Sequence, residues 1–252
     1  MSAIWLIARN DWRRQFAQPF AWVVLALVGA LAAWQFLLAL DMFLRHAPRL
    51  GALPDAPGVT DLVAVPLLQS LSGVLLLLVP LATMQSIAGE RRAHTLPLLL
   101  AAGVGSSRIV TGKFLGAYAL IASIIALVVS MPLLLQLGTE LDLGRLAAAT
   151  LGLLLYSAAL TAIGILCSTW TAHPALAAAA TLVIGSLLVM LDAGARMQGV
   201  DNELVNWLAM SSHLAPFLRG IVSSVAVTYF VLVTTLALLF AARRLDSLRT
   251  RA

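Results

Sequence analysis

The side chains that most often perform catalysis or bind metals are few and scattered in this sequence. The four histidines lie far apart: His46, His94, His173 and His213. None has a metal-ligand neighbour at helical spacing, so no metal site is expected. Gly112-Lys113 is followed by Phe114 and lacks the upstream glycine of a phosphate-binding loop, so the chain is not expected to hydrolyse ATP. Cys167 is the only cysteine, which excludes an internal disulfide. We therefore predict no catalytic residue and no metal in this chain.

Composition places the chain in a membrane. Of its 252 residues 61% are hydrophobic and only 11% are charged, whereas a soluble domain has about 25% charged residues. The mean hydropathy is +0.98. The basic residues include a single lysine and lie in short clusters beside apolar runs, which is typical of orientation signals and not of nucleic-acid binding. Soluble enzymes, disordered proteins and nucleic-acid-binding proteins are thereby excluded.

Six apolar stretches are long enough to cross a bilayer, which takes about 20 residues of helix. They cover residues 20–40, 62–88, 114–137, 146–170, 175–191 and 220–242. The fourth and fifth are separated by a break at Thr171–Pro174, and Pro174 suits a helix start. We expect an all-α membrane protein with one transmembrane domain over residues 1–252.

The distribution of basic residues predicts the orientation. With the N-terminus inside, eleven of the sixteen Lys and Arg residues fall on the inner side. Inner segments of membrane proteins are enriched in these residues, so both termini are expected in the cytoplasm.

Residues 3–16 form an amphipathic pattern. Ile4, Trp5, Ala8, Trp12 and Phe16 fall on one helical stripe, and Arg9, Asn10, Arg13 and Arg14 fall opposite. Such a helix lies in the membrane interface, where it could brace the first span as an elbow helix. The alternative is an ordinary positively charged flank.

A charged triplet, Glu90-Arg91-Arg92, is followed by an apolar stretch too short to span a bilayer. Thr95 is a suitable N-cap and Pro97 would occupy the first turn. The apolar face would comprise Leu96, Leu98, Leu99 and Leu100. A short helix of this kind at the membrane surface could dock in a groove of a soluble partner. It could equally lie in the lipid headgroups, and the residues alone leave both interpretations open.

The outer segment 193–219 is too apolar for a free loop, because it contains Trp207, Met210, Leu214 and Phe217. We expect helices that dip back toward the outer leaflet and are covered by protein. An interfacial helix with Trp207 at the headgroup level is the alternative.

Two motifs resemble ABC-2-type permeases, the six-span membrane subunits of ABC transporters, and most closely their gliding-motility-type branch. The first motif comprises Glu90-Arg91-Arg92, Thr95-Leu96, Leu98-Leu99-Leu100, Ser107-Arg108 and Gly112-Lys113-Phe114. It departs from the family pattern at His94, where glycine is usual, and at Pro97, where an acid is common. The second motif runs from His213 to Val222 and includes Phe217, Arg219 and Gly220.

The resemblance implies a coupling helix near residues 91–102 that docks on a separate ABC ATPase subunit. Glu90 and Arg91 would be the electrostatic part of the dock, and Leu96 to Leu100 the packed part. ATP and Mg²⁺ would be bound by that partner, with no cofactor in this chain. It also implies re-entrant outer helices matching residues 193–219, a second permease subunit in a homodimer or heterodimer, and residence among the lipids of the bacterial cytoplasmic (inner) membrane.

The function expected from the resemblance is ATP-driven export of an amphiphilic or apolar substrate. A path could be lined by small, weakly polar residues, namely Ser70, Ser72, Gly73, Ser157, Thr161 and Gly164. Small residues also serve close helix packing, which is the alternative for this set. The alternative functions are a membrane anchor or force-transmitting subunit without a path, an autonomous secondary carrier, and a lipid-modifying enzyme. The predicted spans contain no charged residue, which disfavours an ion-coupled carrier.

Overall fold

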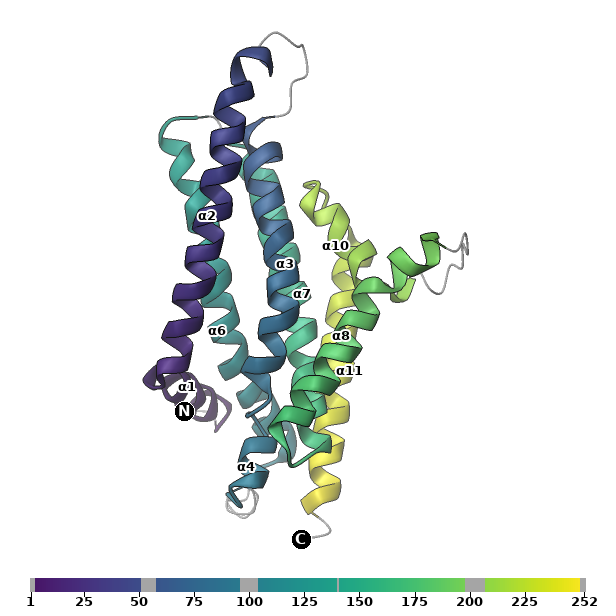
Figure 1. Cartoon of the computed structure of the whole chain (residues 1–252). Coiled ribbons are helices and arrows are strands. Elements are labelled where there is room, and N and C mark those ends of the chain that lie inside the picture. The colour runs from purple at the N-terminus through teal and green to yellow at the C-terminus, as the bar shows by residue number, and fades with distance from the viewer. Residues whose placement is uncertain (1–2, 51–57, 96–103, 140, 198–206, 250–252) are drawn as a thin grey trace.

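The computed structural model describes residues 3–50, 58–95, 104–139, 141–197 and 207–249. Every regular element within these ranges is helical (Figure 1). The elements are α1 (Ala3–Ala17), α2 (Pro19–Leu50), η1 (Thr60–Ala64), α3 (Val65–Thr83), α4 (Ala88–Arg92), α6 (Ser106–Leu134), η2 (Leu135–Leu137), α7 (Leu143–Trp170), α8 (Pro174–Met197), α10 (Met210–Leu218) and α11 (Ser224–Arg249).

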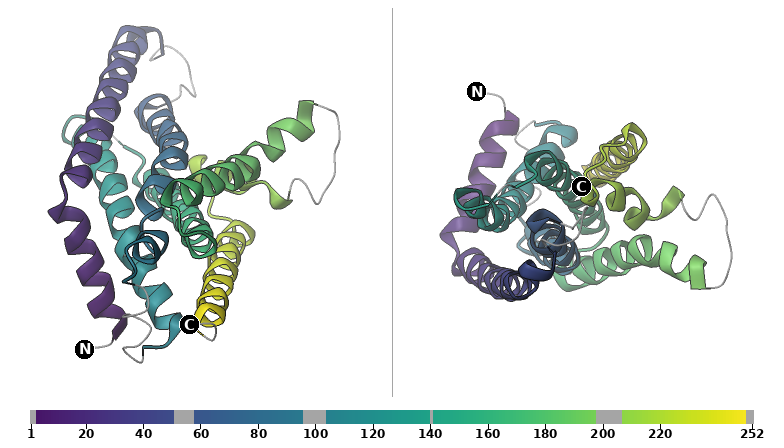
Figure 2. Two further views of the ribbon diagram at one scale, coloured as in Figure 1. Left: turned by 60° about the horizontal axis from the view of Figure 1, so that its bottom comes forward. Right: turned by 90° about the horizontal axis from the view of Figure 1, so that it is seen from above.

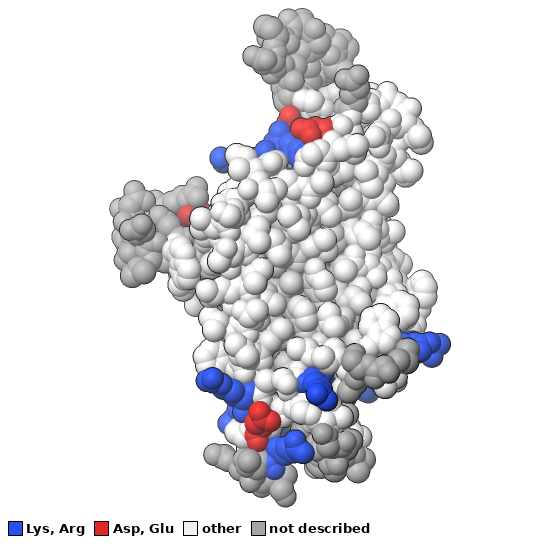
Figure 3. Space-filling view, turned by 180° about the vertical axis from the view of Figure 1, so that it is seen from behind, with Lys and Arg blue, Asp and Glu red and all other residues white. Residues whose placement is uncertain are grey.

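Six helical stretches are long and apolar enough to cross a membrane. They are Ala21–His46, Thr60–Arg92, Ser106–Leu137, Leu143–Trp170, Pro174–Asp192 and Ser224–Arg249. On the face shown in Figure 3, most charged side chains gather at the two ends of the molecule, and most of the surface between them is uncharged. The prediction of an all-α, six-span membrane protein is confirmed.

α7 is the central helix of the bundle. In its most apolar window 67% of the residues are buried inside the molecule, against 11% in α2 and 17% in α8. α3, α6, α10 and α11 all pack on α7, and its Leu153 and Tyr156 belong to the main apolar core. α8 leans away from the other helices and exposes large apolar side chains such as Val183 and Leu187 (Figures 1 and 2).

Several helices begin or end away from the predicted span limits. α6 begins at Ser106, before the predicted span limit at residue 114, and Lys113 within it is buried and paired in the bundle. α2 continues past residue 40 to Leu50, where Asp41 and Arg45 form an ion pair along the exposed helix. α11 begins at Ser224, after the turn that ends α10 at Gly220.

α1 lies across the end of the bundle that also holds α4 and the C-terminal end of α11 (Figures 1 and 2). It packs closely on α6, where Gly112 and Gly116 leave room for Ile7 and Asp11: a Cβ on either glycine would lie 2.8 Å or less from these side chains. The predicted apolar stripe is divided. Ala8 is buried against the bundle, whereas Trp5 and Trp12 point outward with 56% and 42% of their surface exposed. The placement of α1 in a membrane interface stays a prediction.

Candidate functional site at the charged end of the bundle

The short helix α4 carries the charged triplet and is attached to α7 by its first residues. The Ser168 hydroxyl accepts hydrogen bonds from the backbone N–H groups of Ile87 (3.1 Å) and Ala88 (2.8 Å). All three residues are buried. The two N–H groups lie at the start of α4, where the helix itself offers no carbonyl acceptor, and the Ser168 hydroxyl of α7 accepts their hydrogen bonds instead. α4 is therefore fixed to the central helix at its start.

α4 ends in a Schellman motif. His94 has φ +55°, its N–H donates to the Arg91 carbonyl, and the Thr95 N–H donates to the Glu90 carbonyl at 3.0 Å. A left-handed position favours glycine, which is the residue that the resemblance led us to expect in place of His94. The Thr95 hydroxyl also donates to the Glu90 carbonyl, at 3.3 Å.

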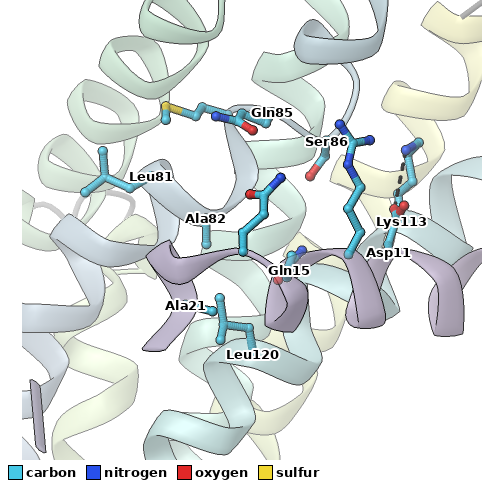
Figure 4. A pocket seen from close by; sticks show the side chains of 12 residues that line it. Asp11, Gln15, Ala21, Leu81, Ala82, Gln85, Ser86, Lys113 and Leu120 are labelled. Atoms are coloured by element: carbon cyan, nitrogen blue, oxygen red, sulfur yellow. Dashed lines mark hydrogen bonds and ion pairs between the residues drawn. The ribbon is translucent and has the colours of Figure 1, made fainter. Parts of the chain in front are cut away.

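A buried lysine joins three elements that are remote in sequence. Lys113 Nζ of α6 lies 2.6 Å from Glu90 Oε1 of α4 and 3.3 Å from Asp11 Oδ2 of α1, the contact drawn in Figure 4. The Lys113 side chain is only 3% exposed and each carboxylate side chain 16%. Charges this deeply buried are held only when they are paired, so the three residues form an ionic cluster that fixes α4 and α1 to α6.

The sequence interpretation missed this cluster. We assigned Glu90 to an outward electrostatic contact, but its side chain points inward to Lys113, and Asp11 had been given no role. The available signal was the position of the only lysine in the sequence, which follows Gly112 directly and precedes Gly116 by three residues. The docking role of Glu90 stays a prediction.

The remaining docking residues are partly described. Arg91 is half-buried and Arg92 is exposed at the end of α4. The predicted apolar part of the dock, Leu96, Leu98, Leu99 and Leu100, lies outside the described residues. α4 therefore presents its two arginines at the point where that segment begins.

A second, smaller apolar core supports this end of the bundle. This core includes Ile87, Ile109, Ile165, Ala241 and Leu245. The segment before α4 therefore packs together with α6, α7 and α11. The Ser106 hydroxyl at the start of α6 also donates a hydrogen bond to Asp246 of α11. A displacement of α4 would therefore act directly on α6, α7 and α11.

The residues predicted to line a path fall into two groups. Ser157, Thr161 and Gly164 are buried in α7, and a Cβ on Gly164 would collide with Thr83 of α3. This is the close packing that we gave as their alternative role. Ser70, Ser72 and Gly73 of α3 lie nearer the surface: Gly73 is exposed with open space around it, and Ser70 donates a hydrogen bond to Gln35 of α2.

The second motif forms α10 and the turn that follows it. His213 stacks on Tyr229 with ring centroids 4.0 Å apart, and Phe217 is fully buried against Gly152 of α7. Gly220 has φ +85° and ends the helix in the same way as His94 ends α4, while Arg219 is exposed beside it. Whether α10 dips into a membrane stays a prediction, and residues 198–206 lie outside the described structure.

Within the described residues, no three His, Cys, Asp or Glu side chains are grouped so that they could hold a metal ion. The geometry at the charged end is one of ionic and hydrogen-bonded attachment of α4 and α1 to α6 and α7.

Comparison with protein families gives one finding that fits this arrangement. The family model described as ABC-2 family transporter protein matches residues 58–242, well over half of the chain, from the start of the second candidate span into the sixth. A search of curated proteins found no match. With six membrane-spanning helices and this match, the chain belongs to the ABC-2 family and is an ABC-2-type permease, a membrane component of an ABC transporter.

Proposed function

We propose that this chain couples ATP hydrolysis by a separate ABC ATPase to the export of an amphiphilic or apolar substrate. The family match carries the proposal, since ABC-2 permeases associate with an ABC ATPase. ATP and Mg²⁺ would be bound by the ATPase, and the permease itself would act without enzymatic activity or cofactor.

The attachment of α4 supports a coupling role for the segment that follows it. α4 is bonded to α7 through Ser168 and to α6 and α1 through Lys113. A partner that moved residues 91–102 would pull on α4, and these contacts would pass the movement to the membrane helices. Within this scheme Glu90 transmits the movement, while Arg91, Arg92 and the leucines beyond contact the ATPase.

The proposed location is the bacterial cytoplasmic membrane with both termini in the cytoplasm. α4 and the ends of α1 and α11 lie at one end of the molecule, where basic side chains predominate on the face shown in Figure 3. This end would face the ATPase, in accordance with the enrichment of Lys and Arg on the inner side of membrane proteins.

The exposed apolar surface supports assembly with a second permease subunit. α3 exposes Gly73 and Leu77 on one face, and α8 exposes Val183 and Leu187 beside it. In a dimer, a path could form along the weakly polar face of α3, to which Ser70 and Gly73 belong. The second subunit would be either an identical chain or a different permease chain. We further propose that the chain is a member of the gliding-motility-type branch of the family, on the basis of its sequence motifs.

Affinity purification of the tagged chain in mild detergent tests the proposal. We expect a stoichiometric ATP-binding subunit and ATPase activity in the eluate. Leu98→Asp should abolish recovery of that subunit, while Leu137→Asp, a matched change at a residue that is 90% exposed beyond the other end of α6, should not. Recovery of a partnerless oligomer, or equal ATPase recovery with both variants, would refute the coupling assignment.

A force-transmitting or anchoring subunit without a path is the second candidate. The burial of Ser157 and Thr161 between helices favours it, because neither side chain faces open space. ATPase rates measured with and without added amphiphiles separate the two functions: stimulation by a transported substrate indicates export, whereas a rate that no amphiphile changes indicates anchoring.

A further inference from the structure

A cavity of about 180 Å³ lies between α1, the end of α3 and α6. Its lining changes character from one side to the other. Ala21, Leu81 and Leu120 form an apolar part, and Asp11, Gln15 and Lys113 belong to the polar part (Figure 4). This division is the one that an amphiphilic molecule presents where its headgroup meets its hydrocarbon chains.

The polar part of the cavity contains a buried hydrogen-bond acceptor without a partner. Gln15 Oε1 is buried and has no hydrogen-bond partner among the described residues, and the same holds for Glu90 Oε2, whose carboxylate is bonded to the cavity-lining Lys113. A buried acceptor without a partner is costly, by about 1–3 kcal/mol for a neutral group. Gln15 Oε1, which lines the cavity, can therefore accept a hydrogen bond from a group bound there.

The charges around the cavity indicate which kind of donor fits. The charged residues that line it have both signs, Asp11 on one hand and Arg14 and Lys113 on the other, which suits a headgroup that itself carries both an ammonium and an anionic group. A primary ammonium group offers three N–H donors and a positive charge. Arg14, which is exposed and also lines the cavity, would pair with an anionic group attached to that amine.

The position and size of the cavity agree with a lipid headgroup. It adjoins the ionic cluster at the charged end of the bundle, and the exposed Leu81 continues from it onto the apolar surface of α3. Its volume of about 180 Å³ leaves room for a small polar headgroup.

We propose that this cavity binds the headgroup of an amine-bearing phospholipid of the phosphoethanolamine class. The ammonium donates to Gln15 Oε1 and pairs with Asp11, the phosphate pairs with Arg14, and the acyl chains leave past Leu81. A bound lipid would thereby contact α1 and the Lys113 cluster together. The inference does not depend on the proposed transport function, because lipid binding is measured without ATPase or substrate.

Native mass spectrometry of the purified chain in detergent, titrated with dioleoyl lipids, tests the assignment. We expect phosphatidylethanolamine to bind at least about fivefold more tightly than phosphatidylcholine, since a trimethylated amine has no N–H and one hydrogen bond is worth about that factor. Gln15→Leu should remove this preference. Asn10→Leu, the matched amide change at an exposed position of α1 outside the cavity, should retain it.

Arg14→Gln separates the two halves of the headgroup. It should weaken both lipids about equally and leave the preference for the amine intact, which a general disturbance of α1 would not do. Soluble glycerophosphoethanolamine, added in excess, should fail to displace the lipid. Displacement would assign the cavity to a soluble amine and overturn the lipid proposal.

Two further results would overturn it. Equal binding of phosphatidylethanolamine and phosphatidylcholine by the unaltered chain would mean that only nonspecific surface lipid or water occupies the cavity. An unchanged preference in Gln15→Leu, with the helical content of the variant preserved, would place the amine site elsewhere.

Discussion

Replacement of Lys113 by methionine removes the one positive charge from the ionic cluster while keeping most of the apolar stem. At the observed separations of 2.6 Å and 3.3 Å, with an effective dielectric constant of about 20, the two attractions amount to about 6 and about 5 kcal/mol. Desolvation of each ion offsets several kcal/mol of this. The loss on substitution is larger than the net contribution of the cluster, because Asp11 and Glu90 are left buried without a counter-charge. We expect Lys113→Met to lower the free energy of unfolding by about 3–5 kcal/mol.

Unfolding in mixed micelles by a rising fraction of dodecyl sulfate, followed by tryptophan fluorescence, measures this difference. Arg108→Met is the matched control, because Arg108 is an exposed cation in the first turns of the same helix. Its effect should stay within about 0.5 kcal/mol.

A triple variant distinguishes the loss of the cluster from the loss of one partner. Asp11→Leu, Glu90→Leu and Lys113→Met together remove every buried charge of the cluster, and they should recover most of the stability lost by Lys113→Met alone. If Lys113→Met were no less stable than Arg108→Met, the burial and pairing described for Lys113 would be refuted.

Three further changes test the packing and the helix ends. Gly152→Ala should lower stability by about 1–3 kcal/mol, because its Cβ would lie 2.7 Å from Phe217 Cγ, whereas Gly73→Ala, with open space around it, should not; thermal unfolding in detergent compares them. His94→Gly should raise stability by about 1 kcal/mol by removing the left-handed strain of a side-chain-bearing residue, and a drop in the same assay would contradict the described end of α4. Ser168→Ala should lower stability by about 2 kcal/mol or more, since two buried N–H groups lose their acceptor, and faster hydrogen exchange of those two amides would locate the effect.

The sequence predicted the helices better than their ends. Apolar length alone identified six spans, and the α7–α8 break at Thr171 to Pro174 was visible from its residues. The predicted third span begins at residue 114, directly after Lys113, whereas the helix that contains it begins at Ser106 and includes this lysine. The ion pairs of Lys113 with Asp11 and Glu90 offset the cost of burying its charge. The partners lie far from Lys113 in the sequence, so no local sequence pattern predicts these ion pairs.

The candidate site was predicted in part. The motif around Glu90 identified the correct region, and the glycine expected by resemblance at position 94 corresponds to the left-handed end of α4. The direction of the Glu90 side chain was not predictable, because it depends on how α1 and α4 pack against α6. Gly112 and Gly116 were the clue, since small residues four apart allow a second helix to approach closely, but they do not say which helix.

The docking of α1 on α6 also sets an order of events during synthesis. Lys113, the ion-pair partner of Asp11, lies 102 residues further along the chain and is therefore synthesised later. At a synthesis rate of about 5–20 residues per second, that partner emerges about 5–20 s later. For this interval the first helix has no glycine groove to occupy and its carboxylate has no lysine. The N-terminal helix therefore reaches its final position on α6 only after the third span has been made, and until then its available contacts are those with α2.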